Sequence, residues 1–168
     1  MARNRVYYGA VGVFVGTGSP TGSHFSSGNS GVNFIQQLER VQSFTDDWSV
    51  TRLDVNQMGE TAAVDRIIVE QPVATLTLNA YSADASNEKK IGLYVSGDQS
   101  ALKNILNKTS DEHNYFIAFA PEGQDVLGWT GQSQVIQVTN ATLTSYAANG
   151  AVGGLPSVDI TLEGLNWA

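Results

Sequence analysis

The sequence of 168 residues contains no cysteine. A disulfide framework and every cysteine-based metal site are therefore excluded. Histidine is almost as scarce, since only His24 and His113 occur, without metal-ligand spacing or a recognisable nucleophile partner. No apolar stretch approaches the roughly 20 residues that span a bilayer, and the N-terminus lacks the apolar segment of a secretory signal. These absences predict a soluble protein made in a reducing cytoplasm, with no metal, no cofactor and no membrane partner.

Positive charge is missing from the last part of the chain. The net charge is −7, and residues 109–168 contribute −6 of it, because they hold no Lys or Arg. Their acids are Asp111, Glu112, Glu122, Asp125, Asp159 and Glu163. A surface of this kind repels phosphate, so ordinary nucleic-acid binding is disfavoured. Acidity can also serve solubility alone.

The length and the hydrophobic pattern predict one mainly β domain over residues 1–168, a barrel or sandwich with one flanking α-helix and long loops. Alternation of apolar and polar residues favours strands at 6–15, 34–55 (with a turn near Thr45-Asp46-Asp47), 66–70, 73–80, 115–120, 135–143 and 158–162. The segment DQSALKNILNK predicts the helix, because Leu102, Ile105 and Leu106 share one helical face. Residues 16–31 are a Gly/Ser-rich stretch typical of a flexible loop.

No catalytic arrangement is found. The segment Gly16–Gly22 resembles a phosphate-binding loop, but no helix pattern follows it. Asp46 and Asp47 are adjacent, so on a strand they would face opposite ways rather than form a pair of carboxylates. The three tryptophans, Trp48, Trp129 and Trp167, would suit either a sugar-binding platform or a buried core or interface. The sequence therefore predicts that the protein is not an enzyme.

Two segments have strand faces that differ from an ordinary solvent-exposed face. Arg66, Ile68 and Glu70 form one face of the form cation, aliphatic, anion, while Ile67 and Val69 form the other. A desolvated aliphatic between paired charges is typical of an interface between subunits, although a singly exposed Ile is also common. The stretch at 52–56 has the same character. The predicted contact residues are Arg52, Asp54, Asn56, Arg66, Ile68 and Glu70.

Several ordered motifs resemble the tail tube (major tail) proteins of tailed bacteriophages. They are Ala-Arg-Asn-Arg-Val at 2–6, Arg-x-Asp-Val-Asn-Gln-x-Gly at 52–59, Asp-Arg-Ile-Ile-Val-Glu-Gln-Pro at 65–72, Leu-Thr-Ser-Tyr at 143–146, Gly-Gly-Leu-Pro at 153–156 and Glu-Gly-Leu-Asn at 163–166. None is a catalytic signature, and together they span most of the chain. The Gly/Ser loop at 16–31 has no counterpart in this pattern.

The resemblance implies hexameric rings that stack into a hollow tube, through which DNA passes during ejection without specific binding. It also implies other tail proteins as partners (sheath or terminator, and baseplate), a location in the virion tail, and assembly in the host bacterial cytoplasm. An acidic lumen would keep DNA from adhering, and the predicted lumen acids are Asp46, Asp47, Asp54 and Asp159. Two alternatives stay open: a carbohydrate-binding β-sandwich, or another tail part such as a terminator or baseplate hub.

Overall fold

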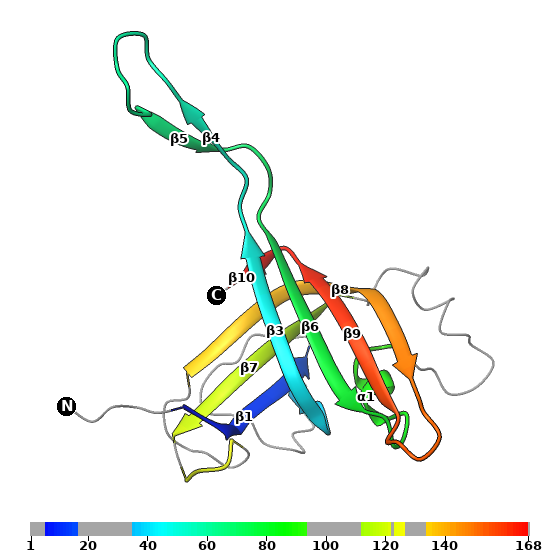
Figure 1. The fold of residues 1–168 in the computed structure, drawn as a ribbon. Helices are drawn as coiled ribbons and strands as arrows, with labels where there is room; N and C mark the ends of the chain where they lie inside the picture. The colour runs from blue at the N-terminus through cyan, green and yellow to red at the C-terminus, as the bar shows by residue number, and fades with distance from the viewer. Residues whose placement is uncertain (1–5, 17–34, 94–111, 122, 127–133, 168) are drawn as a thin grey trace.

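The computed structural model describes residues 6–16, 35–93, 112–121, 123–126 and 134–167, with side chains from residue 11 onward (Figure 1). The predicted helix at 98–108 and almost all of the Gly/Ser loop at 16–31 lie outside the described residues. No helix in the described part of the chain is long and apolar enough to cross a membrane.

Strands dominate the described chain. They are β1 (Val6–Gly16), β2 (Ile35–Gln37), β3 (Val41–Ser49), β4 (Arg52–Val55), β5 (Asp65–Ile68), β6 (Val73–Tyr81), β7 (His113–Pro121), β8 (Gln134–Asn149), β9 (Ser157–Gly164) and β10 (Asn166–Trp167), with one short helix, α1 (Ser86–Lys90). The predicted mainly β fold is confirmed.

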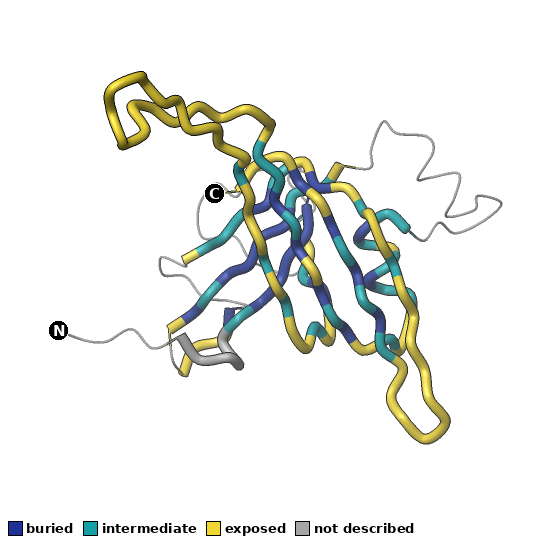
Figure 2. The backbone as a smooth tube through the Cα atoms, turned by 45° about the horizontal axis from the view of Figure 1, so that its top comes forward, coloured by how far each residue is buried: buried dark blue, intermediate teal, exposed yellow. Residues whose placement is uncertain are grey.

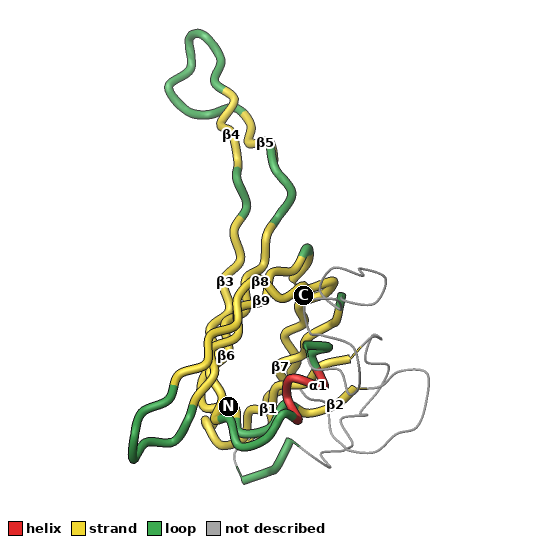
Figure 3. Tube along the Cα trace, turned by 90° about the vertical axis from the view of Figure 1, so that its right-hand side faces the viewer, coloured by secondary structure: helices red, strands yellow, loops and turns green. Residues whose placement is uncertain are grey.

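One antiparallel sheet in the order β2-β1-β7-β8-β9-β6-β3 folds over itself into two layers (Figure 3). The long strand β8 joins the layers, because its first half pairs with β7 and its second half with β9. At the change of partner Asn140 has a positive φ of 51°, a conformation that Asn tolerates well, and its N–H donates to Asn114 Oδ1 at 3.0 Å. Strands β2 and β3 end the strand order, so the sheet does not close into a barrel in the described residues.

The core lies between the two layers and follows from strict alternation along the strands. In β6, Leu76 and Leu78 are fully buried, and their partners Leu162 and Ile160 in the neighbouring strand β9 are buried beside them. The opposite layer contributes β7, whose residues from Tyr115 to Ala118 are buried on both faces. Its second face packs in a smaller cluster made of Phe14, Phe116, Ala118, Ala120 and Val126.

Two local features differ from the sequence prediction. The predicted turn near Thr45-Asp46-Asp47 is wrong, because β3 runs straight through these residues, with Asp46 opposite Leu76 and Asp47 opposite Thr75. Thr-Asp-Asp is an ordinary turn composition, but the ladder with β6 decides the local structure. Helix α1 was not predicted, since it is short and lacks an apolar face. Asn87 holds it in place by accepting from Glu39 N–H at 2.8 Å and donating to Glu39 C=O at 2.7 Å.

Candidate assembly surfaces

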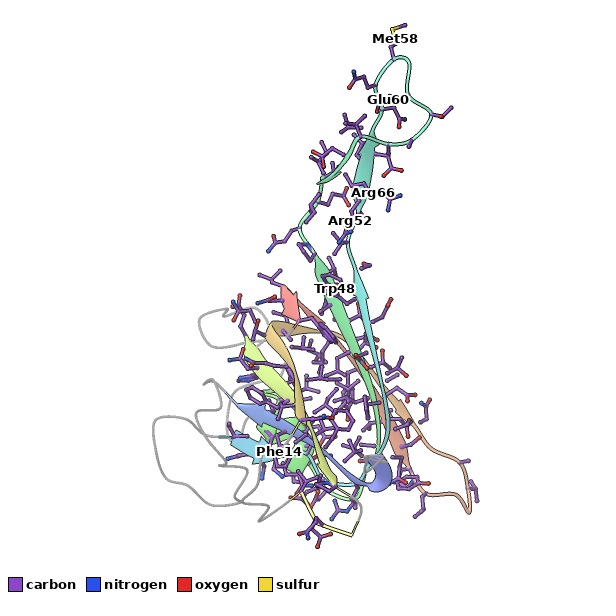
Figure 4. All side chains as sticks on the ribbon, turned by 90° about the vertical axis from the view of Figure 1, so that its left-hand side faces the viewer. Phe14, Trp48, Arg52, Met58, Glu60 and Arg66 are labelled. Atoms are coloured by element: carbon purple, nitrogen blue, oxygen red, sulfur yellow. The ribbon has the colours of Figure 1, made fainter. Side chains whose placement is uncertain are left out.

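A long two-stranded arm, residues 51–71, projects from the body between β3 and β6 (Figure 1). Strands β4 and β5 pair only with each other, and every residue of the arm is exposed. Figure 4 shows Arg52 and Arg66 along its length and Met58 near its tip. An isolated two-stranded ribbon is at best marginally stable in water, so the arm is a surface that lacks a partner within the described part of its own subunit.

The arm has one mainly apolar face, which also carries Asp65 opposite Val55, and one mainly charged face. Leu53 pairs with Ile67, and Val69 N–H donates to Thr51 C=O, which places Leu53, Ile67 and Val69 on one face. The exposed fractions are 57% for Leu53 and 48% for Ile67. On the other face Arg52 pairs with Ile68, and Arg66 Nε lies 2.8 Å from Asp54 Oδ1. Bare apolar faces of this kind mark sites of association.

The structure brings all six predicted contact residues together on the arm. Arg52, Asp54, Arg66 and Ile68 share its charged face, Asn56 begins the tip loop, and Glu70 accepts from Thr51 Oγ1 at 3.1 Å. Whether they touch a second subunit stays a prediction. Sequence reasoning missed Leu53, Ile67 and Val69 as contact residues. Their alternation with polar residues is visible in the sequence, but such alternation is equally typical of a strand face that the protein's own core covers.

At the base of the arm, the body exposes a pair of tryptophans. Trp48, near the end of β3 (Figure 4), and Trp167 of β10 stack with their ring centroids 6.2 Å apart and their planes at 28°. We call Trp48 and Trp167 the Trp pair. A sugar-binding platform would need coplanar rings with free faces on one surface, whereas each of these rings covers a face of the other. Trp129 lies outside the described residues.

At the opposite end of the body, the connection from β8 to β9 forms a second exposed apolar site (Figure 2). We call residues 150–156 the end loop. Val152 is 109% exposed and Leu155 72% exposed. Among described residues, the large exposed hydrophobic side chains lie at the two ends only. The arm and its base hold Trp48, Leu53, Val55, Met58, Val64, Ile67, Ile68, Val69, Leu165 and Trp167, and the other end holds Tyr81, Val152 and Leu155.

The outward face of the layer β3-β6-β9-β8 is polar and free of Lys and Arg. Small hydroxyl residues such as Thr45, Thr77 and Thr161 lie across its middle. Its acids are Asp47, Asp159 and Glu163. Asp159 accepts hydrogen bonds from Asn79 Nδ2 at 2.6 Å and Asn149 Nδ2 at 2.8 Å.

The four predicted lumen acids fall in three places. Asp47 and Asp159 share the outward face just described, and Glu163 of the same face was not predicted. Asp46 pairs with Leu76 and so faces the other side of the layer. Asp54 lies on the arm, paired with Arg66. Adjacent acids on one strand point to opposite faces, so Asp46 and Asp47 cannot both line one surface.

The described residues show no arrangement suited to chemistry. No group of three His, Asp or Glu residues among them could hold a metal ion. A pocket of about 150 Å³ lies between β1 and the start of β3, and Arg40 is the one charged residue among those that line it. Arg40 is paired with Asp84 at 3.2 Å. Ser43 is the one hydroxyl residue among the described residues that line this pocket, and no described His, Asp, Glu or Lys lines it to act as a base.

Comparison with known proteins identifies the fold. Neither a protein-family model nor a curated protein sequence matches the chain. Among solved structures, a chain from the C6-symmetric tail of an empty gene transfer agent particle matches with a TM-score of 0.52 and 10% identity, covering 93% of each chain. The SPP1 tail tube matches with a TM-score of 0.54 and 9% identity, covering 97% of this chain and 77% of that one.

A third match is a chain from the sheath/tube terminator of a PVC extracellular contractile injection system. Its TM-score is 0.57 at 11% identity, covering 100% of this chain and 98% of the other. At such identities the likeness concerns the fold. The chain has a fold found in tail tubes and in related tail and injection-system parts, and the resemblance read from the sequence is confirmed at that level.

Proposed function

We propose that the chain is a structural subunit of a phage-type tail tube, built as rings of six that stack on one another. The observation that carries this proposal is the placement of the exposed apolar side chains. They gather at the arm end and at the end-loop end of the body, and leave the outward face of the layer β3-β6-β9-β8 polar. The fold found in the C6-symmetric tail and in the SPP1 tail tube supports the same assembly.

Two unlike apolar ends favour a head-to-tail contact rather than a closed dimer. In a heterologous contact, one end of a subunit meets the other end of the next, and the contact repeats without limit along an axis. The arm then reaches from one ring to the next. Its apolar face, with Leu53 and Ile67, lies against the body of a neighbour, and its charged face keeps Arg52, Asp54 and Arg66 at the rim.

The polar layer β3-β6-β9-β8 lines the lumen in this proposal. A wall of hydroxyl, amide and carboxylate groups without Lys or Arg holds no phosphate, so DNA can slide past it without specific binding. Asp47, Asp159 and Glu163 each repeat six times per ring. The protein acts without catalysis and contacts other tail proteins, namely a sheath or terminator and a baseplate. It resides in the virion tail after assembly in the host bacterial cytoplasm.

A terminator or baseplate hub is the second candidate, favoured by the comparable match to the tube-terminator chain. A terminator caps a tube, so its rings do not extend into filaments. Sedimentation of the purified protein over rising concentration separates these functions. A tube protein gives particles that grow without limit, whereas a terminator stops at one ring. A monomer at every concentration would contradict both.

A further inference from the structure

We infer that the end loop of one subunit docks on the Trp pair of a subunit in the adjacent ring, so that the bodies of stacked rings touch in addition to the arms. The inference rests on the proposed stacking and names the contact that completes it. The partner is a second copy of this chain. The apolar surfaces at the two ends of the body are the two halves of this contact.

The Trp pair is open because its neighbours on the sheet are small. Trp48 lies opposite Ala74 on β6, and Ala74 lies opposite Gly164 on β9. No large side chain from these two positions covers the indole of Trp48. The exposed fractions remain 46% for Trp48 and 39% for Trp167. Half-exposed tryptophans are typical anchors of protein interfaces, and each indole N–H can donate to a carbonyl of the partner.

The end loop is an ordered, uncharged and apolar turn. Its sequence, Gly-Ala-Val-Gly-Gly-Leu-Pro, carries no ionisable side chain. Gly154 N–H donates to Ala151 C=O at 3.0 Å, and Gly153 adopts a φ of +82°, which favours glycine. Burying such a loop against indole rings desolvates no charge. Its glycines also leave backbone carbonyls open to an indole N–H.

The two sites cannot meet within one subunit. The end loop and Trp48 both belong to the layer β3-β6-β9-β8, but the end loop precedes Ser157 at the start of β9, whereas Trp48 lies level with Gly164 at its end. Eight residues of strand at about 3.3 Å each separate them by roughly 25 Å. Figure 3 shows the end loop and the arm leaving opposite ends of this layer. A second copy shifted along the strands brings its end loop over the first copy's Trp pair.

Cross-linking tests this contact cleanly, because the chain has no native cysteine. Ala151→Cys on the end loop and Asn166→Cys beside Trp167 are both exposed and spare the anchoring side chains. Tubes of a chain carrying both substitutions, treated with a short bis-maleimide, should give a ladder of covalent oligomers. Mixed tubes of the two single variants should give dimers only. Either single variant alone, or Ala151→Cys combined with Thr77→Cys on the mid-sheet face, should give no product.

The outcomes separate this contact from tube formation itself. Tubes that form but give no more product than the Thr77→Cys control would overturn the docking and leave the tube intact. Products from Ala151→Cys alone would replace it with a loop-to-loop contact. Linkage of Asn166→Cys in whole particles to a different tail protein, and never to Ala151→Cys, would assign the Trp pair to that protein. Absence of rings and tubes would remove the proposed function and this contact together.

A substitution series measures the strength of the contact. Leu155→Asp buries a charge against the Trp pair and should raise the concentration needed for tube assembly by about tenfold or more, equivalent to ~1.4 kcal/mol. Thr77→Asp is the matched control, with the same new charge on an exposed mid-strand position. Equal assembly thresholds for the two variants would contradict the docking.

Discussion

Gly164, the last residue of β9, lies close to Val138 and Thr139 of β8. A Cβ built on it would stand 2.9 Å from Thr139 O and 2.6 Å from Val138 Cγ1. Backbone cannot yield as a flexible side chain does, so Gly164→Ala forces the two strands apart. We expect a loss of roughly 1–3 kcal/mol in the free energy of unfolding of the isolated subunit, the usual range for overpacking, measured by denaturant titration.

Gly150→Ala is the matched control for this substitution. It lies on the end loop with no heavy atom within 4 Å of the added Cβ and no positive φ. Its free energy of unfolding should stay within about 0.5 kcal/mol of the wild type. Equal effects at the two positions would show that the approach at Gly164 is not strained.

Tyr146 supplies a pH-dependent contribution to stability. Burial, together with its hydrogen bond to Glu88 Oε1 at 2.7 Å and the charge of that carboxylate, raises the pKa of Tyr146 to about 12. An unfolded tyrosine titrates near 10. Because the folded pKa is the higher, this contribution is fully present below pH ~10 and is lost as the pH rises through 12. The wild type should therefore lose stability over this range relative to Tyr146→Phe, as denaturant midpoints at several pH values will show. If the denaturant midpoints of the two proteins fell in parallel over this pH range, the contribution of Tyr146 would be contradicted.

The arm is an element that the subunit does not need for its own fold. Ser49 and Val73 are paired at its base, so replacing residues 50–72 with Asn-Gly would join β3 to β6 by a tight hairpin turn. The isolated subunit should keep its fold and its free energy of unfolding within about 1 kcal/mol, since the arm is exposed throughout. Tubes should fail to form. Circular dichroism, denaturant titration and sedimentation measure these three quantities, and normal tubes without the arm would contradict its role.

Substitutions at two adjacent residues test which face of the arm makes the contact between subunits. Ile67 and Ile68 are exposed by 48% and 59% and point to opposite faces. Ile67→Asn should raise the concentration needed for assembly more than Ile68→Asn, because Ile67 belongs to the apolar face with Leu53. Sedimentation at matched concentrations measures both. The reverse order would place the charged face, predicted from sequence, at the centre of the contact.

The alternation of apolar and polar residues predicts the strands of the core, but it does not predict what covers the apolar face of each strand. The patterns in β6 and β9 predict buried faces, and the structure has them. The same pattern in the arm states only that one face is apolar, and nothing in the sequence says what covers Leu53 or Ile67. Strand β8 is longer than predicted. Apolar and polar residues alternate less clearly in residues 145–149, and these residues belong to the strand because they pair with β9.

The role of the acidic face depends on where this face lies in the whole assembly. If the layer β3-β6-β9-β8 lines the bore, Asp47→Lys turns a ring of six negative charges into six positive ones. Rings should stay intact, because exposed charges contribute little to stability. DNA ejection should slow, and rising salt should relieve the effect, since each cation adds a phosphate contact. Ejection assays on assembled particles measure this rate.

Asp125→Lys is the control for charge alone, since this exposed residue follows β7 in the other layer. It makes the same change in net charge away from the proposed bore and should leave the ejection rate unchanged. Identical rates for Asp47→Lys and the wild type, in particles whose tubes are intact, would show that this layer does not face the DNA.

Electron microscopy of the purified protein, with averaging of end-on and side views, tests the tail-tube assignment most directly. End views should show rings of six around an open bore, and side views should show these rings stacked in register with a repeat along the axis. A repeat of one ring along the axis is what head-to-tail stacking, arm end to end-loop end, predicts. Dispersed monomers at every concentration, or symmetric dimers joined through like ends, would contradict the account.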